Sequence, residues 1–381
     1  MSRIKSYDVG SMPFIGEFDK FSKGAMNFDS MLPLLHGTDH PLYDPIIYFE
    51  EKVVKGFLDK LEAGINIPNY PQFRDINKMF LDSIDGIEKS KDGYSIVGNL
   101  SVKPEMARIP EVQAIKKNSR RIYEKLDNTF KIKICITGPY TISSLLSNRT
   151  SGIFSELSRV ISKFVSNNIH KDKYSEVELI AVDEPVFGFL SDPLIDYGSE
   201  GREELLKAWE NILHEIISRG VKSCIHLHNT SDELFWEIKS LNIIESHVED
   251  PIYESKRAKQ LLEERDKFLK SSICVTDFDR LVRDKTLIKS REVDEATLVQ
   301  KVEKVWAGIK KGTIDPKDYL ESVEIMKKRL KKAVDFYGIE RVPYAGPECG
   351  MKTYPNYECA LEHLKRVSHA IQYFTQEVRH I

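Results

Sequence analysis

The sequence lacks the features that mark secreted or membrane-spanning proteins. Its five cysteines are an odd number spread over 381 residues, so a disulfide framework is not expected. No uninterrupted apolar run reaches about 18 residues, the length needed to cross a bilayer. Residues 1–8 contain no apolar core of the signal-peptide type. We therefore expect a cytoplasmic protein that makes no membrane contact.

The chain also lacks a concentration of charge of one sign. Its 56 basic and 59 acidic residues leave a formal net charge of -3, and no block of like charge is long enough to follow a phosphate backbone. Nucleic acid is therefore not an expected partner. Linkers rich in glycine, serine or proline are absent as well, so we expect residues 1–381 to form a single domain.

What the chain does contain is an alternation of short β-rich segments with longer helical ones. The segments with strand composition are residues 6–10, 65–67, 132–137, 179–183, 223–228, 243–248, 272–276 and 342–345. Eight strands separated by helices are typical of an α/β protein of the (β/α)8 TIM-barrel class. Two segments are not needed for eight strand–helix units. Residues 87–102 predict an extra hairpin, and residues 279–332 predict helical insertions.

Polar and reactive residues stand just after these segments. In a barrel the loops after the carboxyl ends of the strands build the functional site, so these residues are expected at one mouth. They are Gly10, Ser11, Gln72, Asp183, His226, His228, Glu249 and Cys349. Gly10 allows close approach of the backbone, and Ser11 offers a hydroxyl to a substrate carboxylate. Asp183 carries a carboxylate that can bind an amine or hold a base in place.

His226, Glu249 and Cys349 form the strongest candidate for a metal centre. Cys349 lies in a turn with Gly and Pro, unlike the cysteines inside apolar segments, which we expect to be buried and inert. His226 and His228 are two residues apart on a strand, so both side chains leave the same face. Such ligands suit zinc, with His228 either a fourth ligand or a support for the others. Glu245 is the alternative to Glu249, because the two share a strand face.

Several short motifs follow the expected strands in a fixed order. They are Gly10-Ser11, Thr137-Gly138-Pro139, Asp183-Glu184-Pro185, His226-Leu227-His228, Glu249 and Pro347-Glu348-Cys349-Gly350-Met351-Lys352-Thr353. Together they resemble the motifs of the cobalamin-independent methionine synthase family. The resemblance covers nearly the whole chain, and it is to the C-terminal catalytic barrel of that family.

The resemblance implies a zinc-dependent enzyme that moves a methyl group to a thiol, which is homocysteine in the characterised family, where the product is methionine. His226, Glu249 and Cys349 would ligate the zinc ion. By the same match, Asp183 would bind the amino group of the substrate and Ser11 its carboxylate. The residues assigned to the substrate site are Gly10, Ser11, Gln72 and Asp183, and those assigned to catalysis are Asp183 and His228.

Four features depart from the family pattern. His228 replaces the family's second zinc cysteine, and Gln72 stands where the family has a substrate-binding glutamate. The family's catalytic histidine after the seventh strand has no match in residues 275–279, and its second, N-terminal barrel is not represented. The donor expected for such a core form is a methylcorrinoid, with its carrier protein as a partner, or a pterin.

Three alternative functions fit parts of the same pattern. A related barrel methyltransferase would act on a thiol that is not an amino acid, such as coenzyme M. An enzyme of the uroporphyrinogen decarboxylase type would need no metal and would hold acidic groups with cationic side chains. A non-catalytic binder of thiols or corrinoid would keep the barrel without turnover. Zinc content separates the second alternative from the others, and a turnover assay separates the third.

Overall fold

The computed structural model describes residues 4–31, 40–91, 93–189, 191–289 and 294–379. Its strands are β1 (Lys5–Ser6), β2 (Ile84–Ser90), β3 (Gly93–Val102), β4 (Phe130–Thr137), β5 (Ser175–Glu184), β6 (Lys222–Leu227), β7 (Ile243–Glu245), β8 (Phe268–Cys274) and β9 (Tyr344–Pro347). Its α-helices are α1 (Phe18–Met31), α2 (Tyr43–Glu62), α3 (Ile76–Asp82), α4 (Pro110–Lys117), α5 (Ser119–Leu126), α6 (Pro139–Ser144), α7 (Ile153–Asn168), α8 (Glu200–Ser218), α9 (Lys256–Glu264), α10 (Phe278–Lys289), α11 (Glu295–Lys310), α12 (Val323–Tyr337) and α13 (Tyr357–Arg379).

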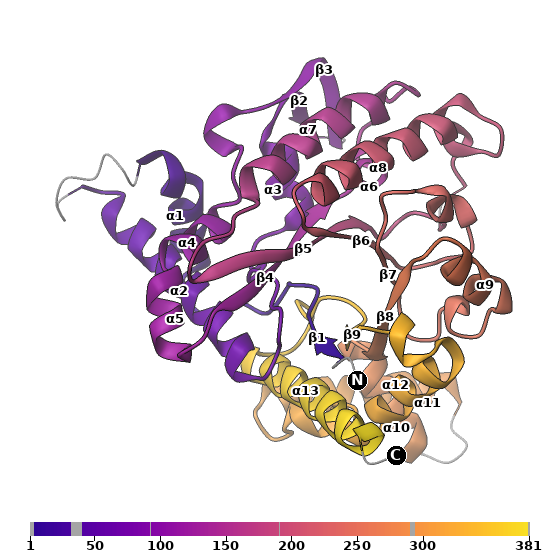
Figure 1. The fold of residues 1–381 in the computed structure, drawn as a ribbon. Helices are drawn as coiled ribbons and strands as arrows, with labels where there is room; N and C mark the ends of the chain where they lie inside the picture. The colour runs from indigo at the N-terminus through magenta and orange to yellow at the C-terminus, as the bar shows by residue number, and fades with distance from the viewer. Residues whose placement is uncertain (1–3, 32–39, 92, 190, 290–293, 380–381) are drawn as a thin grey trace.

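A parallel sheet curls around the centre of the molecule (Figure 1). Seven strands are hydrogen-bonded in the order β1-β9-β8-β7-β6-β5-β4, and every neighbouring pair is parallel. Helices cover the outside of the curl, with α7 and α8 on one side and α12 and α13 on the opposite side (Figure 1). The α/β class is confirmed, and strands form at seven of the eight predicted segments.

The remaining predicted strand is not regular. Residues 65–72 lie between β1 and β4, and isolated parallel bridges at Ile67 and Asn69 connect them to both neighbours. Pro68 and Pro71 fall within this segment, and proline has no N–H group to donate to a ladder. The described residues therefore form a seven-stranded sheet with a bridged segment between its two edges, and not the eight regular strands that were predicted.

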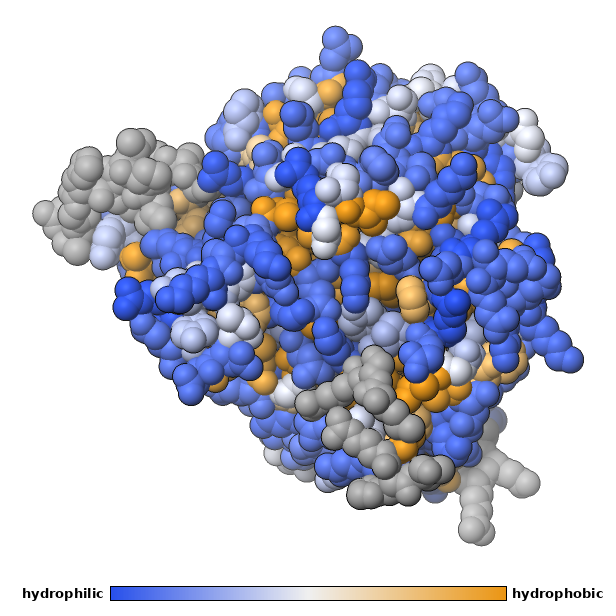
Figure 2. Space-filling view, viewed as in Figure 1, coloured by the Kyte–Doolittle hydropathy of each residue, from blue (hydrophilic) through white to orange (hydrophobic). Residues whose placement is uncertain are grey.

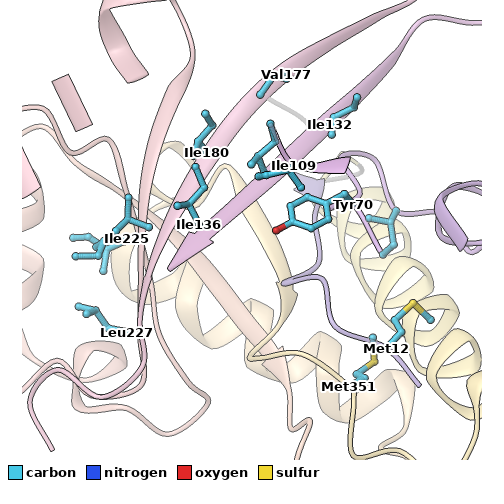
Figure 3. Close-up of a cluster of buried hydrophobic side chains, with 14 of the residues drawn as sticks. Met12, Tyr70, Ile109, Ile132, Ile136, Val177, Ile180, Ile225, Leu227 and Met351 are labelled. Atoms are coloured by element: carbon cyan, nitrogen blue, oxygen red, sulfur yellow. The ribbon is translucent and has the colours of Figure 1, made fainter. Parts of the chain in front are cut away.

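Successive side chains of each strand point to opposite faces of the sheet, and this produces two apolar layers. In β5, Leu179 and Ala181 belong to an inner cluster that draws its members from most strands of the sheet. Ile180 belongs to the larger outer cluster, which packs between the sheet and the helices. Figure 3 shows part of this outer layer, including Ile136 and Ile180. Cys135 and Cys224 are buried in the inner cluster, as predicted for cysteines inside apolar segments.

A buried ion pair fixes the chain just after β1. Nζ of Lys60 lies 2.6 Å from a carboxylate oxygen of Asp8, and both side chains are completely buried. A buried pair needs further hydrogen bonds to offset the loss of hydration. Lys60 supplies them by donating to the carbonyl oxygens of Gly10 at 3.0 Å and Asn69 at 3.1 Å. The predicted substrate-site residue Gly10 therefore lies on a rigid segment.

Both predicted insertions are present. β2 and β3 form an antiparallel hairpin, which covers the predicted residues 87–102. The insertion before β9 contains α10 and α11, which pack on each other.

None of the helices in the described ranges has the length and hydropathy of a membrane span. Figure 2 shows a face on which hydrophilic residues predominate and hydrophobic residues are scattered in small groups.

Candidate metal centre and substrate site

Three imidazoles and one thiol meet at the carboxyl ends of β6, β7 and β9. His226 lies near the end of β6 and His228 directly follows that strand. His247 stands two residues beyond β7, and Cys349 two residues beyond β9. One ligand atom from each of the four side chains lies within 4.8 Å of the others. Ligand bonds to zinc are about 2.0–2.3 Å long, so four ligand atoms at this spacing fit around a single ion.

The contacts between these side chains orient them toward one another. Sγ of Cys349 is 3.6 Å from Nε2 of His228, and the ring centroids of His228 and His247 are 3.9 Å apart. Within the described residues, Nε2 of His226 and of His247 are buried without a hydrogen-bond partner. Buried polar atoms without partners are uncommon, and ligation of a cation would satisfy these two. Three nitrogens and one sulfur form a donor set that suits zinc.

Carboxylates lie behind two of the imidazoles. Oε1 of Glu245 is 2.8 Å from Nδ1 of His226. Oε2 of Glu348 is 3.9 Å from Nδ1 of His247. A carboxylate behind a ligating imidazole fixes the orientation of the ring and its tautomer, so that the other nitrogen faces the metal. In both residues the other nitrogen, Nε2, has no hydrogen-bond partner among the described residues, and the contact between Nδ1 of His226 and Glu245 is close but lacks hydrogen-bond geometry.

Glu245 is itself enclosed by cations. Nζ of Lys133 lies 3.5 Å from one carboxylate oxygen and Nζ of Lys270 lies 3.8 Å from the other, and all three side chains are fully buried. Burial acts to raise the pKa of Glu245, but the two ammonium groups and His226 hold it well below its usual range. Burial likewise acts to lower the pKa of Lys133, and the charge of Glu245 raises it above its ordinary value. Glu245 therefore stays ionised.

The three imidazoles differ in charge. Burial and the neighbouring His226 lower the pKa of His228 to about 2 and that of His247 to about 3. Both rings are therefore neutral at pH 7 and can offer a lone pair. Burial also opposes a charge on His226, but Glu245 and Asp183 raise its pKa above the ordinary value. A metal ion consequently has to displace a proton from His226.

Gly10 and Ser11 lie against the turn that carries Cys349. Met351 donates its backbone N–H to the carbonyl oxygen of Ser11 over 2.8 Å. A Cβ atom on Gly350 would come within 1.8 Å of Oγ of Ser11. Gly10 has a φ of +133°, and a Cβ atom there would lie 2.0 Å from a neighbouring side chain. The structure thus brings two predicted substrate-site residues next to a predicted metal ligand.

Gln72 and Asp183 each present an unpaired polar atom. Gln72 forms a parallel bridge with Ser11, and Asp183 is the register partner of His226 across β5 and β6. Nε2 of Gln72 and Oδ1 of Asp183 are buried and have no hydrogen-bond partner in the described part of the chain. Burial raises the pKa of Asp183, and the neighbouring His226 opposes this rise. Both atoms are suited to contact a polar ligand.

No protein-family model matches the chain, and no curated protein matches its sequence. Several solved structures do match. A B12-independent methionine synthase from Shewanella sp. W3-18-1, in complex with selenomethionine, has a TM-score of 0.61 at 15% identity, with 100% of both chains covered. A putative vitamin-B12-independent methionine synthase from Listeria monocytogenes has a TM-score of 0.56 at 14% identity, with 98% of each chain covered. The fold is that of these methionine synthases.

A third solved structure points to the same class of fold. A methyltransferase from Methanosarcina mazei has a TM-score of 0.51 at 15% identity, with 98% of this chain and 95% of that chain covered. The resemblance inferred from the strand-end motifs is therefore confirmed at the level of the fold. At such low identity the likeness establishes the shared fold.

Glu249 does not join the four ligand atoms. Its side chain is 64% exposed and pairs with Arg280 at 2.6 Å. β7 ends at Glu245, and Glu249 has a φ of 70°, so the alternation of a regular strand does not extend that far. The alternative, Glu245, lies at the centre of the site but stands behind His226. The geometry thus gives no support to ligation by Glu249.

His247 is the ligand candidate that the sequence analysis missed. A signal was present, because His247 lies two residues beyond Glu245 and would share its face on a regular strand. From this run the sequence predicts a carboxylate ligand instead, because a carboxylate oxygen completes a donor set that suits zinc. In the structure, the imidazole of His247 lies among the ligand atoms, whereas the carboxylate of Glu245 lies behind the ring of His226.

Proposed function

We propose that the protein is a zinc-dependent methyltransferase that moves a methyl group to a thiol, with homocysteine as the leading acceptor and methionine as the product. The observation that carries this proposal is the meeting of His226, His228, His247 and Cys349 within 4.8 Å. The unpaired carboxylate oxygen of Asp183 lies on the neighbouring strand. The shared fold supports the methyltransferase class, and one protein of that fold was solved with selenomethionine, an analogue of the proposed product.

Zinc supplies one property to this reaction, because a thiol that binds it loses its proton near neutral pH and stays nucleophilic. The acceptor sulfur then forms a bond to the methyl carbon while the bond between that carbon and the donor breaks. The electron pair of the broken bond leaves with the donor. Much of the remaining acceleration comes from holding the two reactants in line.

The residues around the metal ligands are assigned to binding the acceptor. Asp183 is the partner of the amino group, and Ser11 with the backbone of Gly10 is the partner of the carboxylate. Gln72 adds an amide donor through its unpaired Nε2. Asp183 and His228 are the candidates for catalytic roles, because Asp183 is the register neighbour of His226 and His228 contacts Cys349.

The donor in this proposal is a methylcorrinoid, free or on a carrier protein, with a pterin as the other donor class. We also assign residues 65–72 to the position of the eighth barrel strand. Isolated bridges connect Ile67 to Tyr7, next to β1, and Asn69 to Lys133 in β4, and β1 and β4 are the two edges of the sheet. That arrangement would complete a TIM barrel with its mouth at the proposed site.

A thiol without an amino group is the second candidate acceptor. The neutral amide of Gln72 favours it, because an ammonium group would be held by the single carboxylate of Asp183. Coenzyme M is an acceptor of this kind. A direct comparison of homocysteine with coenzyme M, at equal concentrations, decides between the two acceptor classes.

Metal analysis is the first test. Purified protein is expected to hold about one zinc ion per chain, and Cys349→Ala is expected to lose most of it. Cys359→Ala is the matched control, because Cys359 is buried on α13 and belongs to no ligand cluster among the described residues. Full zinc retention in Cys349→Ala would remove this residue from the site.

Turnover is the second test. Zinc-loaded protein is incubated with methylcobalamin and homocysteine, and the cobalt absorbance and the methionine formed are followed together. Methionine formation that disappears in Cys349→Ala supports the proposal. A protein that binds zinc and thiol but forms no methylated product with either donor class is a binder and not an enzyme.

A further inference from the structure

We propose that His228 is the exchangeable ligand of this centre, and that its imidazole gives up its position to the acceptor thiol while His226, His247 and Cys349 stay in place. This inference rests on the zinc centre of the proposed function. It concerns which of the four ligands moves. A four-coordinate zinc ion leaves no place for a substrate sulfur, so either one ligand departs or the coordination number rises.

His226 is held from behind by a buried network. Its Nδ1 contacts Oε1 of Glu245 at 2.8 Å, and His226 is almost fully buried. Glu245 in turn is fixed by Lys133 and Lys270, and Sγ of Cys224 lies 3.6 Å from its second oxygen. Any rotation of His226 would leave a buried carboxylate with one partner fewer. Loss of a partner by a buried charge is costly, so this imidazole is anchored.

His247 and Cys349 are tied together by Glu348. The carboxylate of Glu348 accepts the backbone N–H of Val248 at 2.9 Å, next to His247, and also lies 3.9 Å from the imidazole of His247. Its second oxygen accepts the backbone N–H of Thr276 at 2.9 Å. Glu348 directly precedes Cys349, so one side chain fixes the ends of β7, β8 and β9 relative to each other.

The turn around Cys349 is held on both sides. Lys270 donates a hydrogen bond to the carbonyl oxygen of Pro347, two residues before Cys349. Met351, two residues after it, donates its N–H to the carbonyl oxygen of Ser11. The thiol therefore sits on backbone that is fixed to β8 and to the segment that follows β1. These bonds hold the backbone that carries the thiol, and the carboxylate of Glu348 stands 3.9 Å from the imidazole of His247.

His228 has no comparable support. Among the described residues its one hydrogen-bond contact is Sγ of Cys349, at 3.6 Å, and no carboxylate lies behind its ring. It is partly buried, as His247 and Cys349 are, and it stands one residue beyond the end of β6. The next residues are anchored, because Thr230 donates its N–H to Asp250 at 3.0 Å, so the backbone stays fixed while the side chain can turn. Of the four ligands, His228 is released at the smallest cost.

The exchange balances without any further reactant. In the zinc-loaded protein, the imidazole of His228 would give up its ligand position and the acceptor sulfur would take it. The acceptor would enter as its thiolate, and its proton would pass to solvent, as is usual when a thiol binds a metal ion. One nitrogen ligand would thus be replaced by one sulfur ligand, while His226, His247 and Cys349 stay in place.

X-ray absorption on the zinc-loaded wild-type protein tests the inference directly. Before addition of thiol we expect three nitrogen ligands and one sulfur ligand. With saturating homocysteine we expect two nitrogen and two sulfur ligands. A zinc ion with three nitrogen and two sulfur ligands would overturn the inference, because His228 would then have stayed bound, but it would leave the proposed function intact. A protein that binds no zinc, or whose zinc takes up no thiol sulfur, would overturn the proposed function and this inference with it.

Three alanine variants give an independent readout through zinc affinity, measured by competition with a chelator. His228→Ala is expected to keep about one zinc ion per chain with a loss of affinity of about tenfold or less, and to bind homocysteine at least as tightly as the wild type. His226→Ala and His247→Ala are expected to lose about 100-fold or more, beyond the range seen when a supporting residue is removed. Circular dichroism shows whether each variant is folded. A folded His228→Ala that loses as much affinity as His226→Ala would overturn the inference.

Discussion

Glu245 is the residue on which the geometry of the site depends most. It is a fully buried carboxylate in contact with His226, Lys133 and Lys270. Glu245→Gln removes the charge that compensates two buried ammonium groups, so we expect the free energy of unfolding to fall by about 3–5 kcal/mol. In the protein that remains folded, zinc affinity should fall by about 10–100-fold, because the ring of His226 loses its support. Urea unfolding and chelator competition measure the two effects.

The matched control is Glu249→Gln. Glu249 is exposed and its pair with Arg280 lies on the surface, so both quantities should stay close to the wild-type values. The opposite order, with Glu249→Gln reducing zinc affinity and Glu245→Gln leaving it unchanged, would restore Glu249 as a ligand and contradict the structure.

At the level of single residues, part of the candidate site was predictable from the sequence. His226, His228 and Cys349 were recognised because each follows a strand-like segment, and the ends of parallel strands meet at one mouth. Glu249 was predicted as a ligand but lies outside the cluster, and His247 lies in the cluster but was not predicted, because both predictions depended on where β7 stops alternating. The end of a strand is set by tertiary contacts such as the bond from Val248 to Glu348, which sequence periodicity does not contain.

Among the elements, α6 begins on a buried carboxylate. Glu184 accepts hydrogen bonds from the backbone N–H of Tyr140 at 3.0 Å and of Thr141 at 2.7 Å, and from the indole N–H of Trp209 at 2.7 Å. Burial raises the pKa of Glu184 to about 7, and the bonds from Trp209 and Thr141 counteract this rise. A Cβ atom on Gly138 would come within 2.3 Å of the same carboxylate, which explains the glycine at this position.

Glu184→Gln is expected to destabilise the protein by about 1–3 kcal/mol, because the amide NH2 would face N–H donors and leave at least one of them unpaired. Urea unfolding at pH 7 measures the change. Glu233→Gln, at an exposed position, should shift the free energy of unfolding by about 0.5 kcal/mol or less. Equal stabilities of Glu184→Gln and the wild type would show that these hydrogen bonds contribute little.

Most elements were predictable because apolar β-rich runs and glycine-terminated helical runs differ plainly in period. Residues 65–72 were the exception. Their apolar start predicted a strand, but Pro68 and Pro71 limit the ladder to isolated bridges. The charges inside the sheet were not predicted either, because Lys133 and Lys270 acquire partners only when distant strands come together.

For the whole molecule, a zinc ion would link β6 and β7 to β9, which lies much further along the chain. A ligand that binds only the folded state stabilises it, by about 2.7 kcal/mol at a free concentration of 100 times Kd. Removal of zinc with a chelator is therefore expected to lower Tm by several degrees, and added zinc should restore it. Differential scanning calorimetry measures the shift. Cys349→Ala should show little response to the chelator, and a wild-type Tm that does not respond either would argue against bound zinc.

His363 on α13 makes the stability of the molecule depend on pH. It is buried beside Tyr354, and burial lowers its pKa to about 3 from an ordinary value of 6.5. Between these values the unfolded chain takes up a proton that the folded chain does not, so the free energy of unfolding falls as the pH decreases. The slope for one such group is at most about 1.4 kcal/mol per pH unit. Urea unfolding of the metal-free protein at pH 7 and pH 5 should show a smaller loss in His363→Gln than in the wild type, and equal losses would contradict this assignment.

Within the described residues, β1 has β9 as its strand partner in the sheet, although most of the other elements lie between the two in sequence. During synthesis on the ribosome, β1 consequently has to wait until β9 has been made before the two can pair. Chains released before that point would lack both this partner and Cys349, the thiol of the ligand cluster. Such fragments could not complete the sheet, and we expect chaperones and proteases to recognise them as incomplete.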